Sequence, residues 1–166
     1  MIEKKSRFFF CISVILVSVL VLALQAIPAA SADTIVLNGK QTTTSTVSSS
    51  QITLSNFNVG TGSNRVLVVG VEANNNFVNS ITFGGVQLTN AVSSFTNNDA
   101  EFWYLKNPSG TANIVATMSG PTAVVVGAYS FSGVDQTNPL PTTATNHNTA
   151  VSSPTISITT DRKSVV

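Results

Sequence analysis

The chain has 166 residues, of which 43% are hydrophobic and only 9% are charged, and its formal net charge is +1. So few charges, so evenly split, give no electrostatic footprint for nucleic acid or for an anionic lipid surface, and no nucleic-acid partner is expected. The single cysteine lies in the N-terminal apolar run, so the rest of the chain must be held together by packing and backbone pairing without disulfides.

The first 32 residues have the pattern of a secretory signal peptide. Three basic residues precede an apolar run from Phe8 to Leu24, and the small residues Ala30-Ser31-Ala32 follow. This order predicts an N-terminal signal-peptide helix that is cleaved after Ala32. The chain would then contact the membrane only through this segment, during export. The protein is then expected to be secreted, extracellular or at the cell surface. An uncleaved membrane anchor is the alternative, because the run is at the short limit for spanning a bilayer.

Removing residues 1–32 leaves enough chain for one domain with its own core. Residues 33–50 contain the tract QTTTSTVSSS, from Gln41 to Ser50, in which one residue is apolar. Such a tract is typical of a flexible linker or of a solvent-facing edge strand, and we favour the linker. The domain itself is expected to span residues 51–166.

Short β-rich runs with turn signals between them follow from residue 52 onward. Ile52–Phe57 and Thr155–Thr160 alternate between apolar and polar residues, which predicts half-exposed strands. Arg65–Ala73 and Ala123–Phe131 are apolar on both faces, which predicts central strands that are covered on each side. Further strands are expected at Val78–Phe83, Val86–Leu88, Ala100–Lys106 and Thr111–Met118.

Glycine and proline mark the turns. Gly84-Gly85 predicts a two-residue hairpin turn, because glycine accepts positive φ angles. Asn107-Pro108-Ser109-Gly110 predicts a type I turn with proline at its second position. Pro139–Pro154 is polar and rich in proline, so a long loop or a raggedly paired edge strand is expected there. Since no segment after residue 32 shows helical periodicity, the sequence predicts an all-β, antiparallel β-sandwich or barrel.

Each of the two central runs has a glycine in its middle, Gly70 in one and Gly127 in the other. A glycine inside a strand costs stability unless a bulge or a close-packed neighbour requires it. We therefore expect the two runs to be paired neighbours whose glycines leave room for a large aromatic ring, with Trp103 as the candidate ring.

Four segments are similar to a domain found in secreted bacterial and archaeal proteins: SNRVLVVGV (63–71), SITFGGVQLT (80–89), EFWYLKNPSGT (101–111) and VVGAYSFSGVDQTNPL (125–140). The resemblance extends from Ile52 to Thr160. It implies a jelly-roll-like β-sandwich, often attached to other extracellular modules, and it implies no catalytic or ligand residue. Members of that family continue past this point into another apolar strand, where this chain has Asp161-Arg162-Lys163. We therefore favour a domain that is truncated at its C-terminus, with a genuine terminus as the alternative.

Candidate catalytic residues are few. No Gly-x-Ser-x-Gly elbow occurs, and the only histidine, His147, lies in a polar loop, so a Ser-His-Asp site is not expected. A glycosidase needs two carboxyl groups about 5–9.5 Å apart, and Glu101 with Glu72 would have to supply them. Asp99 and Glu101 share one face of their strand. The favoured interpretation is that both are charges on the rim of the sandwich.

Metal and cofactor sites are not expected. Calcium takes six to eight oxygen ligands, and the asparagine-rich turns of this chain lack the spacing of a known calcium loop. Asparagine clusters more often bond the backbone of their own turn. A calcium site at Asp99 or Asp135 is the less favoured alternative.

Aromatic residues offer candidate ligand contacts. In Phe102-Trp103-Tyr104, alternation sends Trp103 to one face of the strand and its two neighbours to the other. An exposed ring on a sandwich suits stacking against a sugar, but a lone tryptophan in a domain without disulfides is more naturally a core anchor. We favour the core for Trp103, and Tyr104 or Tyr129 is then the better candidate for a ligand-binding ring.

The sequence thus predicts a non-catalytic extracellular β-sandwich module for adhesion, surface structure or carbohydrate contact. Its partners would be polysaccharides or other components of the cell surface. A small secreted glycoside hydrolase that uses Glu101 and Glu72 is one alternative. A purely structural spacer within a larger surface protein is the other.

Overall fold

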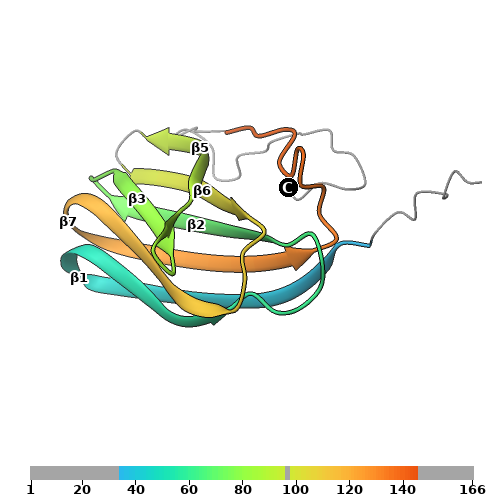
Figure 1. Ribbon diagram of the computed structural model, residues 1–166. Coiled ribbons are helices and arrows are strands. Elements are labelled where there is room, and N and C mark those ends of the chain that lie inside the picture. The colour runs from blue at the N-terminus through green and yellow to red at the C-terminus, as the bar shows by residue number, and fades with distance from the viewer. Residues whose placement is uncertain (1–33, 96–97, 146–166) are drawn as a thin grey trace, which may run out of the picture. The chain divides into compact units, whose positions relative to one another are not determined.

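The computed structural model describes residues 34–95 and 98–145, which belong to one compact unit, Asp33–Val166. The predicted all-β antiparallel sandwich is confirmed. In the described part of the chain, no helix is long and apolar enough to cross a membrane. Seven strands are present: β1 (Val36–Asn58), β2 (Val66–Asn74), β3 (Val78–Phe83), β4 (Val86–Gln87), β5 (Thr89–Phe95), β6 (Asn98–Lys106) and β7 (Thr111–Ser132) (Figure 1). The expected signal-peptide helix and the expected strand Thr155–Thr160 lie outside the described residues.

The two long strands, β1 and β7, bend and pair with each other twice. The segment Val36–Ser45 of β1 pairs with residues 124–132 of β7, and Gln51–Asn58 pairs with residues 111–117. β2, β6 and β5 extend the first pairing, whereas β3 and β4 extend the second. The molecule therefore has a first layer in the order β1–β7–β2–β6–β5 and a second layer in the order β1–β7–β3–β4. Figure 1 shows β1 and β7 curving together from one layer into the other.

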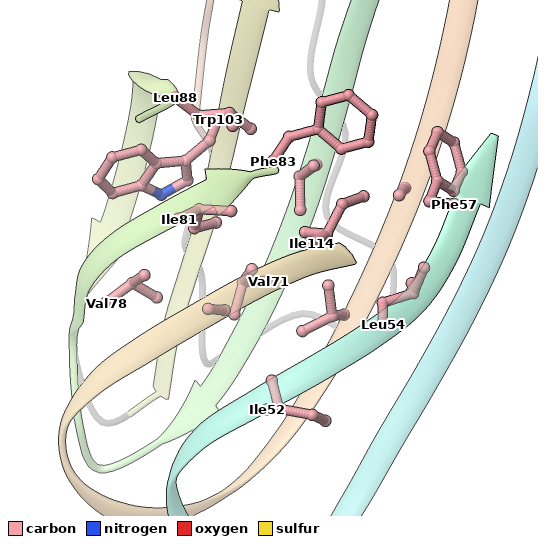
Figure 2. Close-up of a cluster of buried hydrophobic side chains, with 14 of the residues drawn as sticks. Ile52, Leu54, Phe57, Val71, Val78, Ile81, Phe83, Leu88, Trp103 and Ile114 are labelled. Carbon is pink, nitrogen blue, oxygen red and sulfur yellow. The ribbon is translucent and has the colours of Figure 1, made fainter. Parts of the chain in front are cut away.

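The hydrophobic core lies between the two layers and is built from alternate residues of each strand. Figure 2 shows side chains of β1, β3 and the first half of β7 pointing toward those of β2 and β6. Trp103 is among them, which confirms the prediction that it anchors the core. Full burial of an aliphatic or phenylalanine side chain contributes about 1.5–3 kcal/mol. The largest fully buried hydrophobic side chains include Leu54, Phe57, Leu67, Ile81 and Ile114.

The Ser/Thr tract Gln41–Ser50 is a strand, so the favoured linker interpretation is wrong and the edge-strand alternative is the correct one. Gln41 to Ser45 pair with Ala128 to Val124 in continuous register. Among the described strands this part of β1 has β7 as its neighbour on one side only. The tract needs no apolar side chains to form a strand, because backbone hydrogen bonds hold it to β7 and none of its described side chains enters the core.

Two further expectations need correction. The runs Thr111–Met118 and Ala123–Phe131 are one strand, β7, which continues through Gly120 and Pro121. β5 was not expected, and it pairs with β6. The Gly84-Gly85 hairpin is confirmed, with φ angles of 57° and 84° at the two glycines. Residues 107–110 connect β6 to β7, and both Asn107 and Gly110 have positive φ angles, of 51° and 74°.

Removal of residues 34–50 tests whether this segment is structural. We expect the shortened protein to melt about 10 °C or more below the full-length protein, because each lost backbone hydrogen bond contributes about 1 kcal/mol net. The uncovered edge of β7 should also promote association. Thermal unfolding followed by circular dichroism, together with light scattering, measures both effects. An unchanged melting temperature would mean that the segment behaves as a linker after all.

Candidate functional site

The two mid-strand glycines lie directly opposite one another in the first layer. Gly70 of β2 pairs with Gly127 of β7, which confirms that the two apolar runs are paired neighbours. On the other side of Gly70 lies Phe102 of β6, and on the other side of Gly127 lies Thr42 of β1. The row Thr42–Gly127–Gly70–Phe102 thus crosses four strands, and its middle has no side chains.

Aromatic rings cover these glycines from the outer face of the layer. A Cβ atom placed on Gly70 would lie 3.0 Å from Phe102 Cε1, and one placed on Gly127 would lie 3.8 Å from Tyr129 Cε2. The side chain of Phe102 is 55% exposed and that of Tyr129 is 41% exposed. We call the two rings, together with the two glycines beneath them, the aromatic patch.

The expectation that Trp103 would occupy the space above the glycines is wrong. Trp103 pairs with Val69, which faces the core, whereas Gly70 faces outward. The rings that lie over the glycines are those of Phe102 and Tyr129, which share the outer face with them.

The expectation that both apolar runs are covered on each side is wrong for β7, because Val125 and Tyr129 are exposed on the outer face. In β2 it holds for Val66, which is buried on that face, but not for Glu72, which is exposed. Apolar residues on both faces here mark a strand with one buried face and one partly uncovered apolar face.

Tyr104 lies on the same outer face but is half-buried. Together with Val68, Phe131 and Leu140, it packs against the buried side chains of Val66 and Val134. A shallow pocket of about 200 Å³ lies beside it, between β5, the end of β6 and residues 137–143, with Lys106 in its lining. Of the two tyrosines predicted as ligand contacts, Tyr129 is therefore the more exposed, and Tyr104 lines a neighbouring polar pocket.

The structure does not bring Glu72 and Glu101 together. Glu101 pairs with Val71 and is buried, whereas Glu72, one residue further along β2, is exposed on the opposite face of the layer. Opposite faces of one sheet cannot present two carboxyl groups to the same glycosidic bond.

Asp99 and Glu101 are buried between the layers, so the expectation that they are rim charges is wrong. Asp99 is 0% exposed and Glu101 is 7% exposed. Both share the inner face of β6 with Trp103, whose Nε1 donates a hydrogen bond of 2.5 Å to Glu101 Oε2. Asn90 Nδ2 donates to the same oxygen at 2.7 Å. The backbone N–H of Val78 donates to Asp99 Oδ2 at 3.0 Å. We call Asp99 and Glu101 the acid pair.

The surroundings of Glu101 alter its acidity. Burial, together with the hydrogen bond and the negative charge of Asp99, raises the pKa of Glu101 from 4.5 to about 7, against smaller opposing effects of the hydrogen bonds from Trp103 and Asn90. Sequence periodicity places Asp99 and Glu101 on the same strand face as Trp103, so the core position expected for Trp103 already implied that both carboxyl groups point inward.

Asp135 lies in the turn after β7, where its Oδ1 accepts a hydrogen bond of 2.8 Å from the backbone N–H of Thr137. This is the turn-bonding role that short polar side chains often have. Within residues 34–95 and 98–145, no three histidine, cysteine, aspartate or glutamate side chains gather as a metal site would require. His147 lies outside the described residues.

Phe102 is the functional candidate that sequence reasoning missed. Its strand and its outward direction were predicted together with those of Tyr104, but it was not proposed as a contact residue. The available signal was the pair of mid-strand glycines. To identify Phe102 from these glycines, one must know the strand register that sets Phe102 opposite Gly70. That register is known only from the folded sheet.

Alanine at each of the two glycines tests the geometry of the patch. In Gly70→Ala the Phe102 ring must move by a few tenths of an ångström, whereas in Gly127→Ala the nearest side-chain atoms, at 3.6 and 3.8 Å, are at ordinary contact distance. Alanine at a compatible position stabilises by about 0.4–1 kcal/mol. We expect that gain for Gly127→Ala and a smaller gain or a loss for Gly70→Ala, measured by urea unfolding. Equal free energies of unfolding for the two variants would contradict the placement of the Phe102 ring.

Three comparisons with known proteins found no match to this chain. It matches no protein-family model, no curated protein and no solved structure. Its function is therefore inferred from the aromatic patch and from the side chains around it.

Proposed function

We propose that this protein is an exported, non-catalytic β-sandwich module that contacts carbohydrate through the aromatic patch. The observation that supports this is the pair of exposed rings, Phe102 and Tyr129, which cover two adjacent glycines on an open sheet face. The N-terminal signal-peptide pattern supports export. Adhesion or attachment at a cell surface is the role that such a contact would serve.

A ligand that covers an exposed apolar patch removes apolar surface from water, and this removal favours binding. A tyrosine ring has an apolar body and a polar tip, which suits a ligand that has both C–H faces and hydroxyl groups. Sugars have this character. The glycines beneath the rings add no side chain that would compete with a ligand for the same face.

The charges near the patch agree with a weakly charged or neutral glycan. Lys40 lies opposite Tyr129 on β1, and Glu72 lies two residues from Gly70 on β2, so the surroundings have both signs. Specificity would then come from ring contacts and hydrogen bonds more than from charge. A glycosidase that uses Glu72 and Glu101 gains no support from this geometry, because a sheet separates the two side chains.

Alanine substitutions in the patch test the proposal. We expect the purified protein to be retained by at least one insoluble polysaccharide in a panel that covers cellulose, chitin, xylan and mannan. Phe102→Ala and Tyr129→Ala should each weaken that binding about tenfold, which corresponds to about 1.4 kcal/mol. Depletion binding isotherms, with melting temperatures measured in parallel, separate lost affinity from lost folding.

Phe77→Ala is the matched control, since Phe77 is 53% exposed but lies outside the patch, between β2 and β3. It should bind as the unchanged protein does. Retention on no glycan at all would overturn the proposal, and so would an equal loss of binding in Phe77→Ala.

A further inference from the structure

We propose that the acid pair is a proton-binding site in the core, in which Asp99 and Glu101 share one proton at neutral pH and give it up in alkaline surroundings. The site makes the stability of the sandwich depend on pH. This inference is independent of the carbohydrate contact, because the acid pair and the aromatic patch lie on opposite faces of the first layer.

The first observation is an unpartnered oxygen. Asp99 Oδ1 is fully buried, and no N–H or hydroxyl donor of the described residues reaches it. Its carboxyl neighbour is Glu101, two residues along on the same face of β6, with which it can form a hydrogen bond. Such a bond exists only when one of the two carboxyl groups keeps its proton. A shared proton therefore satisfies an oxygen that is otherwise buried without a partner, which would be costly.

The second observation is that none of the seven strands turns a positive charge toward the acid pair. β3, β4 and β5 contain no titratable residue. The titratable residues of β1, β2 and β7 all lie on the outer face, and so do the other two on β6: these are Lys40, Glu72, Tyr129, Tyr104 and Lys106. Two ionised carboxylates in this position would be an uncompensated buried charge.

A proton suits the site better than a metal ion. Three N–H groups, from Val78, Asn90 and Trp103, already point at the oxygens of the acid pair, and their positive ends would repel a cation. Calcium needs six to eight oxygen ligands, and the acid pair supplies two carboxyl groups whose oxygens are partly taken.

The direction of the pH dependence follows from the two states of Glu101. Its pKa rises from an ordinary value of 4.5 to about 7 in the folded protein, so between these values the folded state binds more protons than the unfolded state. The contribution of Glu101 protonation to the free energy of unfolding is then complete below about pH 4.5. It falls as the pH rises to about 7 and has been lost above that value.

Asp99→Asn tests the proposal with little change of shape. The amide oxygen can keep the hydrogen bond from Val78, and the amide nitrogen can donate to an ionised Glu101. The unchanged protein should lose several degrees of melting temperature between pH 5 and pH 8. Asp99→Asn should lose less over the same range, because the repulsion from Asp99 is gone while the burial of Glu101 remains, and it should melt higher than the unchanged protein at pH 8. Glu72→Gln, which removes an exposed carboxylate from the opposite face, is the matched control and should keep the original profile.

A second measurement does not depend on the variant folding well. Trp103 is the only tryptophan of the chain, and it is hydrogen-bonded to Glu101, so its fluorescence reports ionisation of the acid pair in the unchanged protein. We expect a titration with a midpoint near pH 7. A flat melting profile between pH 5 and 8, or a fluorescence midpoint below pH 5, would overturn the proposal. A rise in melting temperature with added calcium at fixed pH, reversed by a chelator, would overturn it in favour of a cation.

Discussion

The twofold pairing of β1 with β7 is the interaction on which the rest of the structure depends. Each strand contributes to both layers, so the hydrogen bonds that hold β1 to β7 also fix how the layers face one another. β2 and β3 attach to different halves of β7, on the side away from β1. A core without disulfides can then form between them, because the layers are joined by continuous strands.

Sharing β7 between the layers also explains why an apolar face is left open. The second half of β7 packs its inner residues against the core. Its outer residues are covered only in part, where Phe131 and Leu140 pack against Val66 and Val134. Toward the bend, Val125 and Tyr129 are exposed on this face, and Gly127 between them is half-buried. A glycine in each of two central strands would weaken the sheet at this point. The rings of Phe102 and Tyr129 shield the weakened backbone and form the surface that we propose for ligand contact, so one arrangement would serve both stability and binding.

β6 links this outer surface to the chemistry of the core. Its alternation sends Phe102 outward and sends Asp99, Glu101 and Trp103 inward. The buried carboxyl groups are tolerated because N–H donors from β3, β5 and β6 bond to them. One shared proton would remove the electrostatic repulsion between Asp99 and Glu101. A polar cluster of this kind restricts how β6 can pack, since any shift in register would leave these groups without partners.

The sequence alone determined most of the strand runs, the Gly84-Gly85 turn, the all-β class and the core position of Trp103, because each depends on local alternation, turn chemistry or the size of one side chain. It missed β5. It did not determine that the Ser/Thr tract is a strand, because that tract is held by backbone bonds to β7 and has no apolar pattern of its own. Nor did it join the two halves of β7 across Gly120 and Pro121. On β6 the core position of Trp103 already implies that Asp99 and Glu101 point inward and Phe102 outward, because alternate residues share a face. Only the tertiary structure decided which donors the two carboxyl groups find inside the core and which residues of different strands lie side by side. Alternation relates residues of one strand, whereas neighbours across strands are set by long-range pairing, which placed Gly70, Gly127 and Phe102 in one row.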